Sequence, residues 1–319
     1  MKPLSILLAI YIAVRADSNA DFHQGPVTDI IVLDGQIYSC SQGGIFKGAG
    51  DGLQLLARPA IRVTALAALT NRGIDGLLFG GGEPGVFGSV GWLNLQTKEA
   101  DPVNRIGKDL VYDLAGRSGS HFAVACANGE VRTSVVAKDA RVHSTPVHKH
   151  TATARAVAFS RDKKWIASSG FDGVIIISSF VKEEAFEPRQ LLDHTSGVEC
   201  LVFSPDSKYI ASGSLDSKVR LHGVNGKLIR TYSGLGMADE PVAGRVPSRV
   251  LSLAWHDDRL VAGTSKGSLH LLSLTDDTSL RIPRTGTDPI YSLHFGPTDN
   301  LLIGGQSRLQ VFRLKFPEK

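Results

Sequence analysis

One pattern recurs in this chain at a fixed offset of 44 residues, and no other feature limits the fold as strongly. Each copy opens with an alternating apolar run, passes through a polar turn into a run of small residues, and reaches a tight turn at an aspartate. The offset places residues 154–160 (ARAVAFS) on 198–204 (VECLVFS), residues 166–172 (IASSGFD) on 210–216 (IASGSLD), and His150 on His194. The chain is therefore expected to fold as a series of similar units.

Each unit predicts three or four short strands that cannot bury both of their faces alone. Polar turns at residues 161–164 (RDKK) and 205–208 (PDSK) separate the first two strands of each copy. A period of about 40–45 residues with several strands per unit is typical of a β-propeller blade. In such a ring, the neighbouring blades cover the faces that one unit leaves open.

Residues 150–237 resemble the WD-repeat β-propellers, whose blade reads roughly Gly-His, Val-x-x-Leu-x-Phe-Ser-Pro-Asp-Gly, Leu-Ala-Ser-Gly-Ser-x-Asp and Val-x-Leu-Trp-Asp. The second copy matches in place at Val198, Leu201, Phe203, Ser204, Pro205, Asp206, Ala211, Ser212, Gly213, Ser214, Asp216, Val219 and Leu221. The match departs at the Trp-Asp dipeptide, which occurs nowhere in the chain. Ser178 and His222 stand where the tryptophan would be, and Lys149 and Asp193 replace the glycine before the histidine.

The resemblance implies a structural hydrogen-bonded tetrad in each regular blade, formed by a histidine, a strand serine or threonine, the turn aspartate and the tryptophan. Without the tryptophan, two partial tetrads are expected here. They are His150, Ser168 and Asp172 in one blade, and His194, Ser212 and Asp216 in the next.

The length of 319 residues fits one closed ring. Seven blades of about 42 residues would use about 294 of them. The last repeat stops after three strands, and a strand is spare at the start, which is the closure used by WD-repeat propellers. We therefore predict an all-β, seven-bladed WD-repeat propeller as a single domain over residues 21–316, with the N-terminal strand completing the last blade. Residues 80–88 (GGGEPGVFG) are expected to be a long turn, and residues 234–247 a surface loop.

The first sixteen residues have the features of a secretory signal peptide. Lys2 precedes the apolar run from Leu4 to Val14, and small residues follow, so cleavage is expected after residue 16 or, alternatively, after residue 20. An exported protein in the periplasm or outside the cell follows from this interpretation, without a stable membrane span once the signal is removed. The alternative is a cytoplasmic protein in which the apolar run is a strand of the propeller.

The charge balance and the cysteines narrow the expected partners and the expected redox state of the thiols. The formal net charge is +4, and loss of Lys2 and Arg15 with the signal leaves 33 basic against 31 acidic residues, or +2. A nucleic-acid partner is not expected, because binding one requires a concentrated basic face. Cys40, Cys126 and Cys200 fall in different repeats inside apolar strands, and we predict buried free thiols.

The chain contains no nucleophile elbow, no His-Glu-x-x-His motif, no dinucleotide-binding fingerprint and no calcium-binding loop. His143, His148 and His150 lie close together, but no carboxylate is spaced to complete a metal site with them. His194, Ser212 and Asp216 resemble a Ser-His-Asp set, yet recurrence at blade positions indicates structural hydrogen bonding. We predict no enzyme activity, no cofactor and no metal.

The candidate partner-binding residues are expected near one rim of the ring, where propellers commonly bind partners. Arg62 and Arg249 directly precede their inner strands, Arg155 lies one position into its own, and Glu199 occupies the place of Arg155 in the next blade. Resemblance to exported bacterial WD-repeat proteins implies a scaffold with a protein partner, such as a periplasmic cytochrome or a surface enzyme. The alternatives are a propeller enzyme, either a lactone hydrolase or a quinone-dependent dehydrogenase, and an intracellular scaffold.

Overall fold

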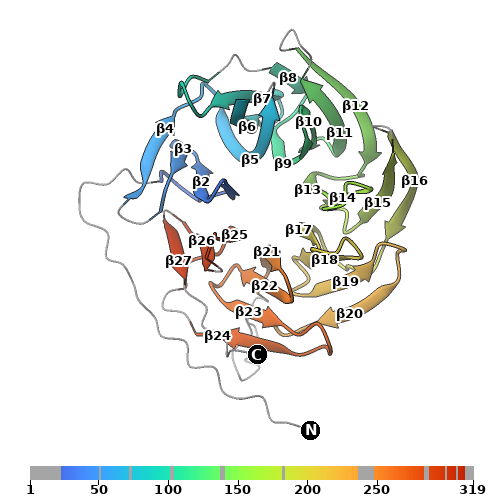
Figure 1. The fold of residues 1–319 in the computed structure, drawn as a ribbon. Helices are drawn as coiled ribbons and strands as arrows, with labels where there is room; N and C mark the ends of the chain where they lie inside the picture. The colour runs from blue at the N-terminus through green and yellow to red at the C-terminus, as the bar shows by residue number, and fades with distance from the viewer. Residues whose placement is uncertain are drawn as a thin grey trace.

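The fold is a ring of seven small β-sheets (Figure 1). The computed structural model describes residues 23–49, 52–71, 74–100, 104–136, 141–181, 184–235, 248–283, 287–298, 300–306 and 308–312. No α-helix occurs in this part of the chain. The all-β, seven-bladed propeller predicted from the sequence is confirmed.

Within the described residues, twenty-seven strands form the sheets. In chain order they are β1 Asp29–Leu33, β2 Gln36–Ser41, β3 Gly44–Lys47, β4 Gln54–Ala57, β5 Arg62–Asn71, β6 Ile74–Glu83, β7 Phe87–Asn94, β8 Asn104–Gly107, β9 Val111–Ser118, β10 His121–Cys126, β11 Glu130–Val136, β12 Val142–Lys149, β13 Ala154–Phe159, β14 Trp165–Gly170, β15 Ile175–Val181, β16 Glu184–Leu191, β17 Val198–Phe203, β18 Tyr209–Ser214, β19 Val219–Gly223, β20 Leu228–Tyr232, β21 Val250–His256, β22 Arg259–Thr264, β23 Leu269–Leu272, β24 Ser279–Ile282, β25 Ser292–Phe295, β26 Leu301–Gly304 and β27 Leu309–Phe312.

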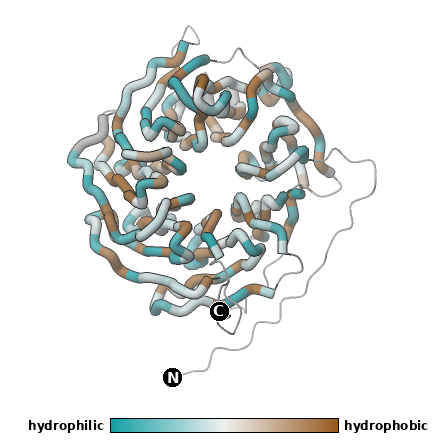
Figure 2. Tube along the Cα trace, turned by 180° about the vertical axis from the view of Figure 1, so that it is seen from behind, coloured by the Kyte–Doolittle hydropathy of each residue, from teal (hydrophilic) through white to brown (hydrophobic). Residues whose placement is uncertain are grey.

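Each blade is a group of consecutive antiparallel strands. Six sheets have four strands, and the seventh contains β25, β26 and β27. The first strand of each sheet lies next to the first strand of the following one, and β1 contacts β25, which closes the ring. Figure 2 shows the same ring from behind, with apolar residues on every blade.

The second strand of a blade is covered on both faces, and this explains its small residues. Ile210 to Ser214 on β18 are buried without exception. A Cβ added at Gly213 would meet the side chain of Val250 in the next blade and the sulfur of Cys200. The run of small residues seen in the sequence therefore lets adjacent blades approach closely.

Side-chain hydrogen bonds cross every joint between neighbouring blades, because buried backbone groups need partners. Asp29 on β1 accepts the N–H of Leu66 on β5, and Asp113 on β9 accepts that of Val157 on β13, each at 2.8 Å. Hydroxyl groups donate to carbonyl oxygens at the other joints: Thr64 to Val111, Ser169 to Val198, Tyr232 to Ser273, Ser252 to Ile290, and Ser292 to Val27.

The last joint closes the ring through residues far apart in sequence. Ser292 Oγ donates to the carbonyl oxygen of Val27 at 2.9 Å, and the Val27 N–H donates to the carbonyl oxygen of Gly305 at 3.0 Å. The N-terminal strand predicted to complete this blade is not found in residues 23–28, which form no strand, and residues 21–22 of the predicted domain lie outside the described residues. Completion of the last blade by that strand therefore stays a prediction. The signal segment, residues 236–247 of the predicted loop and the outermost residues of the predicted domain also lie outside the described residues.

The predicted long turn at residues 80–88 is wrong. β6 continues to Glu83 and β7 begins at Phe87, so the glycines pair in the sheet and only residues 84–86 connect the strands. The glycines permit close packing, since a Cβ at Gly81 would collide with the carbonyl oxygen of Arg62.

The described residues also contain no helix long and apolar enough to cross a membrane.

Candidate functional site

The predicted network of the fourth blade forms as expected. His150 Nε2 lies 2.9 Å from Ser168 Oγ, and His150 Nδ1 lies 3.1 Å from an oxygen of Asp172. Asp172 also accepts the backbone N–H of Thr151 at 2.9 Å, so it fixes the turn that carries the histidine. Ser168 is fully buried and His150 is almost fully buried.

A second histidine extends this network. His148 on β12, the outermost strand of the third blade, lies 2.8 Å from Ser168 Oγ through Nδ1 and 2.8 Å from Ser178 Oγ through Nε2. Ser178 occupies the tryptophan position of the family pattern, so His148 supplies the missing link to Ser168. Burial, and to a smaller degree the charge of His150, lowers the pKa of His148 to about 3.

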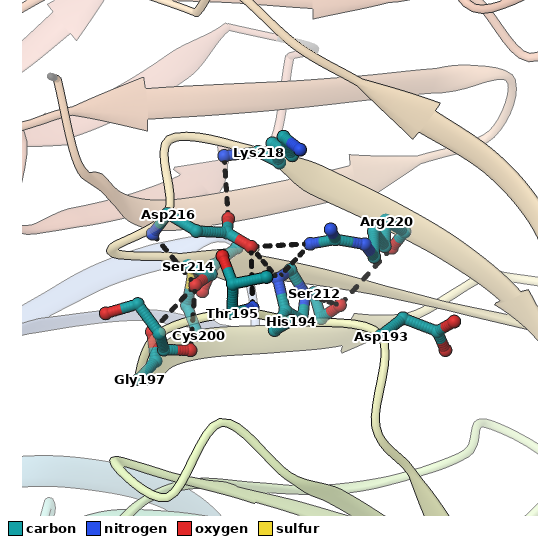
Figure 3. Close-up of polar contacts among 12 residues, drawn as sticks. Asp193, His194, Thr195, Gly197, Cys200, Ser212, Ser214, Asp216, Lys218 and Arg220 are labelled. Carbon is teal, nitrogen blue, oxygen red and sulfur yellow. Dashed lines mark hydrogen bonds and ion pairs between the residues drawn. The ribbon is translucent and has the colours of Figure 1, made fainter.

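The fifth blade carries a different network, in which a buried arginine joins the histidine and the aspartate (Figure 3). His194 Nε2 lies 2.8 Å from Ser212 Oγ, and Nδ1 lies 3.0 Å from Asp216. The buried Arg220 donates to the same aspartate at 2.7 Å. Burial raises the pKa of Asp216, but hydrogen bonds from His194 and Arg220 outweigh it and hold that pKa well below its usual value. His222 pairs with Asp193 at 2.8 Å instead of with Ser212.

A third remnant of the tetrad occurs in the first blade, where sequence reasoning did not find it. His23 is buried, lies 3.2 Å from Ser39 Oγ through Nε2, and packs its ring 4.2 Å from that of Phe46. Nδ1 has no hydrogen-bond partner in the described structure. The spacing could have revealed it, because His23 precedes Val27 by the same four residues that separate His150 from Ala154.

The predicted rim contains one closely joined pair. Arg155 on β13 donates to Glu199 on β17 at 2.7 Å through Nε, and its Nη2 lies 2.6 Å from the same oxygen. The side chains are 27% and 11% exposed. The guanidinium also lies 4.5 Å from the ring centre of Tyr112 and 5.5 Å from that of Phe171, whose exposed fraction is 42%.

The other two predicted rim residues do not join this cluster. Arg62 and Arg249 are exposed on the second and sixth blades. No contact within the described residues connects either of them to Arg155 or Glu199. The structure therefore brings together Arg155 and Glu199 across one blade joint, with Tyr112 and Phe171 added.

The family description "WD domain, G-beta repeat" matches residues 141–177 and 186–222, which span most of the fourth and fifth blades. The chain is a WD-repeat β-propeller. Over 93% of its length it is similar to the crystal structure of the WD40 beta propeller domain of Doa1, with a TM-score of 0.71, 14% sequence identity and 95% of that chain covered. A search of curated proteins found no match.

The buried networks of this WD-repeat propeller hold its blades together. Ser168 and Ser212 are fully buried, so neither hydroxyl can reach a substrate from solvent. Among the described residues, no group of three histidine, cysteine or acidic side chains could hold a metal ion. WD-repeat propellers in general serve as scaffolds for protein interactions, and the partly exposed Arg155–Glu199 cluster, with the exposed Phe171 beside it, is the candidate for such a role.

Proposed function

We propose that this WD-repeat propeller is an exported, non-catalytic scaffold that binds a protein partner through the rim around Arg155 and Glu199. The observation that carries the proposal is the ion pair between these residues, which spans two blades and is flanked by Tyr112 and the exposed Phe171. Arginine, tyrosine and phenylalanine are the side chains enriched at protein interfaces.

The chemistry of the rim favours a protein over a nucleic acid. Arg155 is already neutralised by Glu199, and the mature chain would carry only 33 basic against 31 acidic residues. A phosphate backbone is bound by several unpaired cations on one face. A mixed pair beside aromatic rings suits a partner surface that combines polar and apolar groups.

If the propeller is exported, its partner should be a protein of the periplasm, the cell envelope or the cell exterior. The signal peptide inferred for residues 1–16 would place the propeller in the periplasm or outside the cell, and the resemblance to exported bacterial proteins suggests an envelope cytochrome or enzyme as the partner. N-terminal sequencing of the protein purified from its host should give a start at Asp17 or Asp21 in the extracytoplasmic fraction. An intact Met1 in the cytosol would contradict export.

The scaffold role is tested by affinity capture from that fraction, with the purified propeller as bait. One protein recovered in stoichiometric amounts, and lost when excess untagged propeller is added, is the expected result. Specific recovery of no protein would contradict the scaffold role. Turnover of a lactone, or binding of a quinone, by the purified protein would contradict the non-catalytic part of the proposal.

A further inference from the structure

A cleft opens at the ends of β13, β17 and β21 that lie away from Arg155 and Glu199. Its volume is about 520 Å³, within the range of about 300–1,000 Å³ typical of ligand pockets. Three aromatic rings from equivalent strand positions line it: Phe159, Phe203 and Trp255. Leu201 and Pro205 add further apolar surface, so the floor of the cleft is apolar across three blades.

Short hydrogen-bonded turns hold two sides of the cleft in place. Ser160 Oγ donates to Asp162 at 2.6 Å and accepts the N–H of Trp165 at 3.0 Å. The next blade repeats this arrangement with Ser204 and Asp206, also at 2.6 Å. Both turns are held by hydrogen bonds from their own side chains. A ligand that binds beside them therefore costs little conformational entropy in these turns.

The charges at the two ends of the cleft are opposite. Arg161 lines the end on the fourth blade, and its turn also carries the exposed Lys163 and Lys164. The carboxylate of Asp162 in that turn accepts hydrogen bonds from Ser160 Oγ and from the N–H of Lys164.

The end on the sixth blade is acidic. Asp257, whose side chain is 67% exposed, lines the cleft, and Asp258 follows it. Both lie near one cation, since Arg259 is 3.8 Å from Asp257 and 3.9 Å from Asp258, while His256 lies 3.9 Å from Asp257.

We propose that this cleft binds an extended peptide segment of a partner protein, with an apolar side chain between Phe203 and Trp255, an acidic side chain beside Arg161 and a basic one beside Asp257. The opposite charges at the two ends of the cleft favour a peptide with both charges, because a ligand whose charges all have the same sign would be repelled at one end. The apolar floor adds affinity by burying the central side chain. The propeller would then have two binding surfaces, at opposite ends of the same inner strands.

A labelled peptide tests the proposal. The probe is fluorescein-labelled Gly-Glu-Ser-Phe-Leu-Ser-Lys-Gly, compared by fluorescence anisotropy with an all-acidic peptide, an all-basic peptide, and one in which Ser-Ser replaces Phe-Leu. The mixed-charge peptide should bind most tightly, and the Ser-Ser peptide should not bind measurably. Arg161→Glu should weaken binding of the mixed peptide by about three- to tenfold and reduce its advantage over the all-basic peptide.

Matched variants separate the cleft from other surfaces. Lys227→Glu makes the same charge change at an exposed turn outside the cleft and should leave all affinities unchanged. Arg155→Glu should also leave them unchanged, so that failure of the rim and failure of the cleft can be told apart. The proposal is overturned if the mixed and Ser-Ser peptides bind equally, or if Arg161→Glu, folded as judged by circular dichroism, keeps the wild-type ratio of affinities for the mixed and all-basic peptides.

Discussion

His148 Nε2 and Ser178 Oγ lie 2.8 Å apart, although 30 residues separate them and they belong to different blades. The contact ties the outer edge of the third blade to the third strand of the fourth. A neutral imidazole can satisfy both of its serine partners, since one ring nitrogen donates and the other accepts. Protonation would remove the acceptor in a buried place, and this makes the network sensitive to acid.

Stability should therefore fall as the pH drops. The pKa of His148 is lowered to about 3 in the folded protein, against about 6.5 when unfolded. The unfolded state binds the proton first, so stability from this residue is full above about pH 6.5 and is lost progressively toward pH 3. His148→Gln should reduce the loss of unfolding free energy between pH 7 and pH 5 by about 1–2 kcal/mol. His143 is exposed, and His143→Gln should leave this loss as it is in wild type. If urea titrations give wild type and His148→Gln the same change of unfolding free energy with pH, His148 does not have this role.

Removal of Asp216 should be strongly destabilising. Arg220 is buried and would lose its carboxylate partner, and breaking a buried ion pair typically costs about 3–5 kcal/mol. Asp277→Ala serves as the control, because Asp277 is 66% exposed and pairs with Arg230 at 3.6 Å, so its loss should cost less than about 1 kcal/mol. Chemical denaturation measures both. Similar losses for the two variants would mean that the Asp216 pair contributes no more than a surface contact.

Ring closure depends in part on Ser292. Ser292→Ala removes the hydrogen bond to the Val27 carbonyl and should lower the unfolding free energy by about 1–3 kcal/mol. Hydrogen exchange of the Val27 amide should also become faster, since that amide bonds to Gly305 across the same joint. Ser279→Ala on the exposed part of β24 should change neither quantity. Unchanged exchange at Val27 would show that this bond does not hold the joint.

The three thiols should be unreactive in the folded protein. All are free, Cys40 and Cys126 are buried as predicted, and Cys200 is partly buried. Burial raises the pKa of Cys126 to about 12 and also raises those of Cys40 and Cys200, so little thiolate exists at pH 8. A thiol-specific chromogenic reagent should label none of them under native conditions and all three in denaturant. Rapid native labelling of even one cysteine would contradict this arrangement.

The sequence alone was enough for the fold and for the regular part of the networks. The offset of 44 residues located two blades, and the family pattern identified His150, Ser168 and Asp172 correctly. Those residues recur because every regular blade needs the same internal contacts.

Apart from the His23–Ser39 contact, which follows the repeat spacing, the contacts not predicted from the sequence lie outside the repeat pattern. His148 reaches Ser168 from the preceding blade, and the alternation of a strand does not reveal which neighbouring blade its side chain will contact. Arg220 occupies the unspecified position between Val219 and Leu221 of the family pattern, so that pattern could not indicate its bond to Asp216. For the rim, position in the repeat predicted the place of Arg155 but not its pairing with Glu199, which depends on the distance between blades.

The most direct test of the scaffold proposal exchanges the charges of the rim pair. Arg155→Glu combined with Glu199→Arg keeps an ion pair across the joint but loses the guanidinium contacts with Tyr112 and Phe171. The double variant should therefore stay folded, with an unfolding free energy lowered by about 1–2 kcal/mol, while the charges presented to a partner are reversed. Its affinity for the protein captured by wild type should fall at least about tenfold, and Lys227→Glu should bind as wild type does. An unchanged affinity for the folded double variant would contradict binding through this rim.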